Sequence, residues 1–185
     1  QQTQRTYAIG VADDRNRALV LLDANLQVVA TVEDTGDVPE DFEDTGYEPI
    51  RDVAVHGDQV IVLASSSHAK GSGLRLLDLD GRFLRTIAAG RFQNPYAVTA
   101  SHGRAFVVDD DDDDDKDDGD DDDDDDDESG HVLHVVELQS GDILQSLRLD
   151  LQGYVSAILV DGDKIYIAGF DANEVVVLQL AGSEA

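Results

Sequence analysis

The sequence predicts an all-β protein built from antiparallel four-stranded repeats of the β-propeller type. Short apolar segments rich in Val, Ile and Leu alternate with turns that contain Gly, Asp or Asn, which is typical of strands and hairpins. These segments recur in a constant order, and no stretch of ten residues has a helical apolar period. A length of 185 residues with 41% hydrophobic residues suits one domain, spanning residues 1–185.

The repeat is clearest in three segments, residues 49–87, 95–147 and 154–180. Each segment has an apolar strand, a Gly turn, a second strand, a variable loop and a third strand, and the first two segments add a fourth. Six of the predicted strands are second or third strands, at Val60–Ala64, Leu74–Leu79, Ala105–Val108, Val132–Leu138, Lys164–Ala168 and Glu174–Leu180. Residues 7–32 fit the last three strands of a further repeat. The predicted total is fourteen strands, or about three and a half blades.

This strand count predicts that the chain does not close on itself, since a propeller ring needs at least four blades and usually more. The terminal blades are therefore expected to pair with another polypeptide, including other copies of the chain. Otherwise they are the open ends of an excerpt from a longer propeller. A generic sandwich or barrel of short strands is the alternative fold.

One segment carries a resemblance to a known family. Leu74–Ile87, with the sequence LRLLDLDGRFLRTI, is followed by Gly90 and Pro95. It resembles the NHL repeats and related six-bladed β-propellers. The resemblance implies that ligands and partners bind across the central channel or the loop face. Enzymatic members resemble lactonases or lyases and need carboxylate, Asn and His ligands around the axis. The sequence has no matched set of these ligands, so no catalytic residue and no organic cofactor is assigned.

The net charge of −28 excludes the function classes that need a basic surface. A chain this acidic repels nucleic acid and anionic membranes, and favours cations and basic proteins as partners. Abundant Asp beside three Lys resembles the proteins of salt-loving microbes. The chain has no Cys and no apolar run long enough to span a bilayer. It begins at Gln1 and contains no Met, so we expect a secreted protein with a processed N-terminus, or else a trimmed fragment.

A polyaspartate run, residues 109–128, is predicted to be a loop inserted between the second and third strands of one blade. Its seventeen Asp and one Glu against one Lys give it a charge of −17. One interpretation is a solvated loop extended by self-repulsion, and the other is a loop that binds divalent cations, best calcium, or a basic partner. The match to an EF-hand loop is poor, because Lys116 falls on a ligand position when Gly119 is placed at the turn. The candidate metal ligands are Asp109, Asp110, Asp111, Asp112, Asp113, Asp114, Asp115, Asp117, Asp118, Asp120, Asp121, Asp122, Asp123, Asp124, Asp125, Asp126, Asp127 and Glu128.

Other polar residues give weaker signals. The segment Glu33–Glu48 repeats EDTG twice and is either a second cation-binding loop or an ordinary polar connection. His56 and His102 precede hairpin glycines in successive repeats, which marks them as turn residues. His131 and His134 are three apart on a strand, so they face opposite sides and cannot hold one ion together.

Two functional hypotheses follow. The first is a non-catalytic extracellular binding or structural scaffold, with an acidic loop for calcium or a basic partner. The alternative is a fragment of a calcium-dependent propeller hydrolase or lactonase. They differ in where the acidic residues lie, since an enzyme needs several carboxylates that converge on the axis, whereas this sequence places them along one loop.

Overall fold

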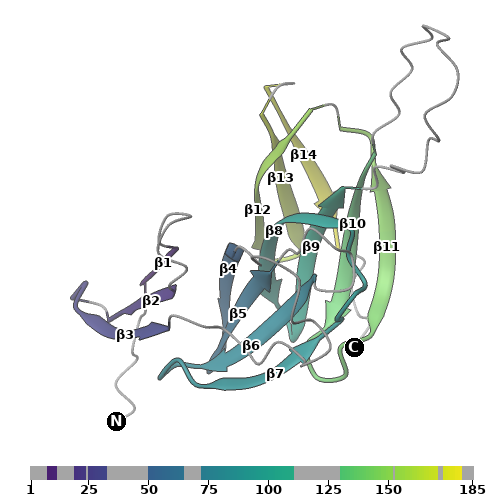
Figure 1. Ribbon diagram of the computed structural model, residues 1–185. Helices are drawn as coiled ribbons and strands as arrows, with labels where there is room; N and C mark the ends of the chain where they lie inside the picture. The colour runs from purple at the N-terminus through teal and green to yellow at the C-terminus, as the bar shows by residue number, and fades with distance from the viewer. Residues whose placement is uncertain are drawn as a thin grey trace, which may run out of the picture.

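The computed structural model describes residues 8–11, 19–23, 25–32, 50–64, 72–110, 130–151, 153–170 and 173–180. Within these ranges the chain forms fourteen strands in four antiparallel sheets and has no helix (Figure 1). None of the described residues belongs to a helix that could cross a membrane. The all-β, propeller-type prediction is therefore confirmed.

Each sheet is a meander of strands that follow one another in the chain, and we call the sheets blades 1 to 4. Blade 1 contains β1 (Ala8–Val11), β2 (Leu19–Leu22) and β3 (Val28–Val32). Blade 2 contains β4 (Ile50–His56), β5 (Gln59–Ala64), β6 (Gly73–Asp78) and β7 (Phe83–Ile87). Blade 3 contains β8 (Asn94–Ser101), β9 (Arg104–Asp110), β10 (His131–Glu137) and β11 (Ile143–Leu149). Blade 4 contains β12 (Val155–Asp161), β13 (Lys164–Gly169) and β14 (Glu174–Gln179).

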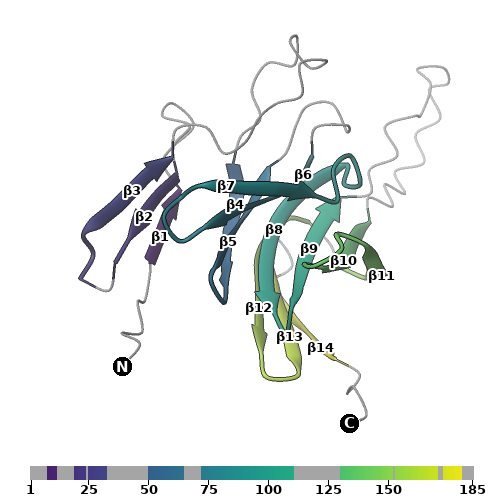
Figure 2. The same cartoon turned by 90° about the horizontal axis from the view of Figure 1, so that it is seen from below.

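The blades follow one another as an open array, with blade 1 at one end and blade 4 at the other (Figures 1 and 2). The first strands of blades 2, 3 and 4 lie side by side, β4 against β8 and β8 against β12. No sheet pairing joins blade 1 to blade 4 among the described strands. The prediction that the chain does not close on itself is confirmed, and the six strands predicted from the repeat are present within one or two residues at each end.

The core consists of three apolar layers, each between neighbouring blades. Alternation along a strand sends successive side chains to opposite faces. On β5, Ile61 and Leu63 pack toward blade 3, whereas Val60 and Val62 pack toward blade 1. Phe106 on β9 contributes to the third layer, which joins blades 3 and 4. The second strand of each inner blade is thus buried on both faces, which explains why β5 and β9 are nearly continuous buried runs.

The turn between the third and fourth strands of a blade contacts the blade before it. A Cβ atom added at Gly81 would lie 2.7 Å from Val32 Cγ2 on β3, and one at Gly141 would lie 2.9 Å from Ile87 Cβ on β7. Both glycines have a φ of +82°. The absence of a side chain therefore serves both the turn and the close approach of blades. Because Val32 takes the place of Ile87, β3 is a fourth strand, and blade 1 has the last three strands of a repeat, as predicted.

Polar contacts also tie the blades together. The Val98 N–H donates to Asp52 Oδ2 at 2.8 Å, which links β8 to β4. The Gly103 N–H donates to His56 Nε2 at 3.0 Å, which links the first hairpins of blades 2 and 3. Arg85 on β7 donates to the Leu138 carbonyl oxygen at 2.8 Å. His56 is a turn residue, as expected, and in addition accepts a bond from the next blade.

Candidate binding site at the inner strands and the base of the acidic loop

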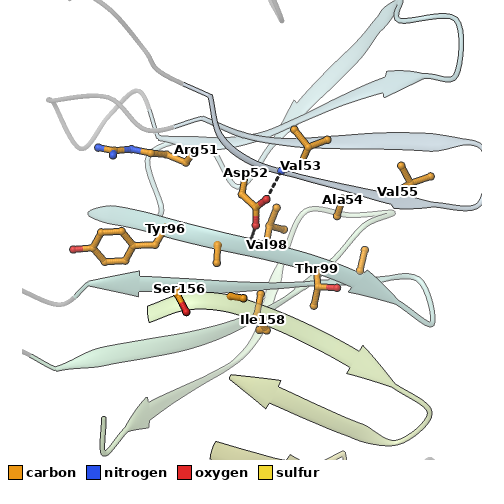
Figure 3. Close-up of a pocket in the computed structure, with 13 residues that line it drawn as sticks. Arg51, Asp52, Val53, Ala54, Val55, Tyr96, Val98, Thr99, Ser156 and Ile158 are labelled. Atoms are coloured by element: carbon orange, nitrogen blue, oxygen red, sulfur yellow. Dashed lines mark hydrogen bonds between the residues drawn. The ribbon is translucent and has the colours of Figure 1, made fainter. Parts of the chain in front are cut away.

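A pocket of about 400 Å³ lies over the first strands of blades 2, 3 and 4 (Figure 3). Equivalent stretches of β4, β8 and β12 line it, at residues 51–55, 96–100 and 156–158. Most of these side chains are small or apolar, and the polar ones are Arg51, Asp52, Tyr96, Thr99 and Ser156. A hollow with polar groups at fixed positions is a usual form of a binding site.

Asp52 is the acidic side chain in this lining. Its Oδ1 accepts the Val53 N–H at 2.8 Å, and its Oδ2 accepts the Val98 N–H (Figure 3). Burial raises the pKa of the Asp52 carboxyl, because desolvation disfavours the charged form. The two backbone hydrogen bonds act in the opposite direction and offset part of that rise. Asp52 therefore links β4 to β8, and its carboxyl group is partly buried there.

One end of the pocket is marked by Arg51 and Tyr96, whose side chains project to the same side in Figure 3. Both residues lie near the start of their strands, β4 and β8. The Tyr96 hydroxyl donates to Asp110 Oδ2 at 2.6 Å and accepts a bond from Asn94 Nδ2 at 3.1 Å. Tyr96 thus lines the pocket and also binds the last residue of β9, from which the acidic run continues.

The structure differs from the expected loop boundary at its first two residues. Asp109 and Asp110 belong to β9 and are buried. The Asp109 carboxylate accepts the backbone N–H of Gln93 at 2.9 Å and that of Asn94 at 2.8 Å. These bonds satisfy both carboxylate oxygens, so Asp109 fastens the connection into β8 and has no oxygen left without a partner for an ion. The inserted segment therefore starts after Asp110, not at Asp109.

Two histidines on β10 face these two carboxylates from opposite sides of the sheet, as their spacing predicts. His134 Nε2 lies 3.5 Å from Asp109 Oδ2, and its Nδ1 lies 2.7 Å from Ser146 Oγ. His131 Nδ1 lies 3.9 Å from Asp110 Oδ1. Both His131 Nδ1 and Asp110 Oδ1 are buried, and neither atom has a hydrogen-bond partner among the described residues.

The tautomer of His131 follows from its Nε2 contact. Nε2 contacts the Gly153 carbonyl oxygen, which can only accept, so Nε2 carries a proton. The other ring nitrogen, Nδ1, faces Asp110 Oδ1, and the Tyr96 hydroxyl donates to the second oxygen of the same carboxyl group. The last residue of β9 thus contacts side chains of both β8 and β10.

Several predicted site residues lie outside the described part of the chain. These are the remaining candidate ligands, Asp111–Asp127 and Glu128, and the second acidic segment, Glu33–Glu48. In the part of the chain that the structure describes, no three His, Asp or Glu side chains gather at one point that could hold a metal ion. The calcium assignment stays a prediction.

Sequence reasoning missed Asp52 and Tyr96. A signal for Asp52 was present in the repeat, since the residues at its position in blades 3 and 4 are Ala97 and Ala157. A charged residue where the other repeats have Ala indicates a specific contact. The role of Tyr96 depends on a partner from another strand, Asp110, and had no comparable signal.

Comparison with known proteins supports the fold. The chain is similar to the structure of the computationally designed Ika4 protein, with 12% identity and a TM-score of 0.55 over 98% of this chain and 94% of that one. It is similar to the Neurospora crassa Pan2 WD40 domain, with 14% identity and a TM-score of 0.55. It is also similar to Pyrococcus horikoshii acylaminoacyl peptidase, with 11% identity and a TM-score of 0.54.

The matches to the two natural proteins cover 97% and 94% of this chain, but only 53% of the Pan2 chain and 28% of the peptidase. WD40 repeats are propeller blades, so the likeness supports a propeller-like fold, while the narrower resemblance to NHL repeats is not supported. No family model and no curated protein sequence matches the chain.

Proposed function

We propose that this chain is a non-catalytic β-propeller scaffold that binds a basic, extended protein segment across the pocket on its inner strands, β4, β8 and β12. The observation that carries the proposal is that β9 ends, and the acidic sequence begins, at one end of the pocket. Asp110 pairs with Asn94 and His131 at the starts of β8 and β10. Arg51 and Tyr96 mark the same end of the sheets. The acidic sequence therefore continues from β9 at the end of the pocket that Arg51 and Tyr96 line.

Charge favours a basic partner. Residues 109–128 contribute −17 to a net charge of −28. Such a field attracts Lys- and Arg-rich segments over distances of about a Debye length, roughly 8 Å at physiological salt. It raises their association rate more than their final affinity. Short-range contacts must then come from a shaped surface, and the pocket is lined by Tyr96, Thr99 and Ser156.

The inner strands also favour an extended ligand. β4, β8 and β12 are the outermost members of their sheets on the pocket side. Among the described strands none pairs with them on that side, and extended peptides bind such edges. The Val98 N–H donates to the Asp52 carboxylate, so fewer backbone groups on this edge are left for nonspecific pairing with other strands.

The hydrogen bonds of Asp52 favour a binding role for the pocket over a catalytic one. Both oxygens of Asp52 accept backbone N–H groups. A carboxylate held in this way positions strands, whereas a general base or a metal ligand needs an oxygen directed at the substrate or ion. The hydrolase or lactonase interpretation would require further carboxylates at the same pocket.

The test measures the affinity of a fluorescein-labelled Arg/Gly peptide by anisotropy, with a Glu/Gly peptide as the charge control. Replacing residues 111–127 by a Gly/Ser loop should weaken binding and flatten its salt dependence. Ser156→Arg places a positive charge in the pocket, and Gln145→Arg makes the same charge change on the exposed β11. Ser156→Arg should weaken binding about tenfold more than Gln145→Arg. Equal affinities for these two variants would exclude the pocket as the site.

Calcium is the second candidate ligand, favoured by the density of carboxylates in residues 111–128. Hard divalent cations prefer carboxylate oxygens, and a loop of this kind would bind several ions weakly. Titration calorimetry with calcium chloride on the parent and on the 111–127 replacement separates the two ligands. A protein that binds the basic peptide but takes up no calcium supports the protein-binding role alone. An extracellular location is part of this proposal and is tested by finding the mature chain outside the cell.

A further inference from the structure

The third strands of the blades show that one face of blade 4 corresponds to a buried face of blades 2 and 3 but has no neighbouring blade among the described residues. Leu74, Leu133 and Val175 hold one position in the repeat, because each pairs with the equivalent residue of the preceding strand. Leu74 and Leu133 are 0% and 2% exposed and pack toward the following blade. Val175 is 59% exposed. The same residue position is therefore core in blades 2 and 3 and surface in blade 4.

The next position on that face gives the same result. Leu76 and Val135 are 0% and 9% exposed, whereas the equivalent Val177 is 52% exposed. Leu159 on β12 and Tyr166 on β13 lie in line with Val177 across the sheet, and Leu159 is also exposed. We call Leu159, Tyr166, Val175 and Val177 the trailing face of blade 4. The equivalent residues of blades 2 and 3 pack against the blade that follows.

Blade 1 has the complementary face, which would receive a preceding blade. Leu22 holds the position of Leu77 and Val136, which are buried against the blades before them. Leu22 itself is half-buried, and its neighbour Val28 on β3 is exposed. We call Leu22, Leu26 and Val28 the leading face of blade 1.

Leu26 indicates what kind of blade fits there. It occupies the turn position of Gly81 and Gly141, has a φ of 61° and is 68% exposed. In blades 2 and 3 that position is glycine because the fourth strand of the preceding blade comes too close for a Cβ atom. A four-stranded blade would collide with Leu26. In its described residues, blade 4 has three strands and places no fourth strand there.

We propose that the trailing face of blade 4 binds the leading face of blade 1 of a second copy of this chain. Blade 4 presents the apolar face that packs against a following blade elsewhere in the repeat. Its described residues form no fourth strand that would collide with Leu26. The contact joins two different surfaces, so two copies related by a two-fold axis form it twice and close. The product is a ring of eight blades, within the range seen for propellers. This inference goes beyond the proposed function and does not depend on it.

The charge of the chain sets the conditions for this assembly. Two copies of net charge −28 repel one another at low ionic strength. Salt shortens the Debye length from about 8 Å at 0.15 M to about 3 Å at 1 M and leaves the apolar contact intact. The dimer should therefore tighten as salt is raised, which is opposite to the expected behaviour of the basic peptide. The two proposals can thus fail independently.

The test is sedimentation equilibrium of the 185-residue chain over a range of concentrations and of KCl. The expected species has twice the chain mass of 20.0 kDa. Val177→Asp and Leu26→Asp each place a charge in the contact and should raise the dimer dissociation constant about tenfold or more. Leu144→Asp is the matched control, since Leu144 is 50% exposed on β11 and lies on neither face. Circular dichroism checks that each variant is folded.

Mixing the two variants tests the head-to-tail arrangement. A mixture of Val177→Asp and Leu26→Asp has one intact contact per pair, between the wild-type blade 4 of one chain and the wild-type blade 1 of the other. It should dimerise more tightly than either variant alone. A wild-type chain that stays monomeric at every concentration and salt would overturn the proposal. So would a dimer that Val177→Asp leaves unchanged, or open polymers in place of a closed pair.

Discussion

The substitution Gly141→Ala tests how the blades approach one another. Gly141 lies in the turn between β10 and β11, and an added Cβ would meet Ile87 Cβ at 2.9 Å. Ile87 Cβ is attached to the backbone of β7 and cannot rotate away, so a strand must shift. Overpacking of this kind costs about 1–3 kcal/mol. The φ of +82° adds about 1–2 kcal/mol for a residue with a side chain. The total is about 2–5 kcal/mol.

Gly103→Ala separates these two contributions. Gly103 has a φ of +73°, but nothing lies within 4 Å of its added Cβ. This variant should lose only the conformational part, about 1–2 kcal/mol. Gly81→Ala should fall between the two, because its close contact is Val32 Cγ2, the end of a side chain.

Urea unfolding followed by far-UV circular dichroism gives the free energy of unfolding of each variant from the midpoint and slope. The expected order of stability is wild type, Gly103→Ala, Gly81→Ala and Gly141→Ala. If Gly141→Ala is no less stable than Gly103→Ala, the glycine is needed for the turn alone and the account of blade contacts is wrong.

Three further predictions concern the acidic residues. Because burial raises the folded pKa of Asp52, the wild type gains stability as pH falls through that pKa toward 3.8. Asp52→Asn removes this titration, and its amide NH2 faces one of the two backbone N–H groups that Asp52 accepts. The stability of the wild type relative to this variant should therefore rise as the pH falls from 7 to 4, as measured by thermal melts. Asp109→Ala should destabilise the fold by about 1–3 kcal/mol for each of the two backbone amides left unpaired, measured by urea unfolding. Replacing residues 111–127 by a Gly/Ser loop should leave the urea midpoint nearly unchanged, because loop length has a small effect on stability, and should abolish calcium uptake in titration calorimetry. Parent-like calcium binding by that variant would place the ion elsewhere.

The strands of this fold were predictable because each one carries its own signal. Runs such as Val60–Ala64 are apolar and β-branched, and a glycine turn ends the preceding strand at Gly57. The constant order of these segments predicted the blades, and their number predicted the open array. Even the incomplete first blade was visible, since residues 7–32 match only three strands of the repeat.

The residue at which β9 ends within the acidic run was not predictable. Within a run of identical residues, nothing in the sequence separates Asp110 in β9 from the residues that follow it. The separation comes from partners on β8 and β10, namely Tyr96 and His131, whose positions depend on the register of the sheet. The same limit applied to His56, where the turn was evident but the bond to Gly103 of the next blade was not.

The most direct test of the central claim is a map of the amide chemical shifts of this 20.0 kDa chain on addition of the Arg/Gly peptide. The proposed binding mode predicts the largest changes at residues 51–55, 96–100 and 156–158, on the strands that line the pocket. It also predicts changes at Asp110, where the acidic segment leaves β9. Changes confined to residues 111–128, with the three inner strands unaffected, would show that the charge alone binds the peptide and that the pocket has no part in it.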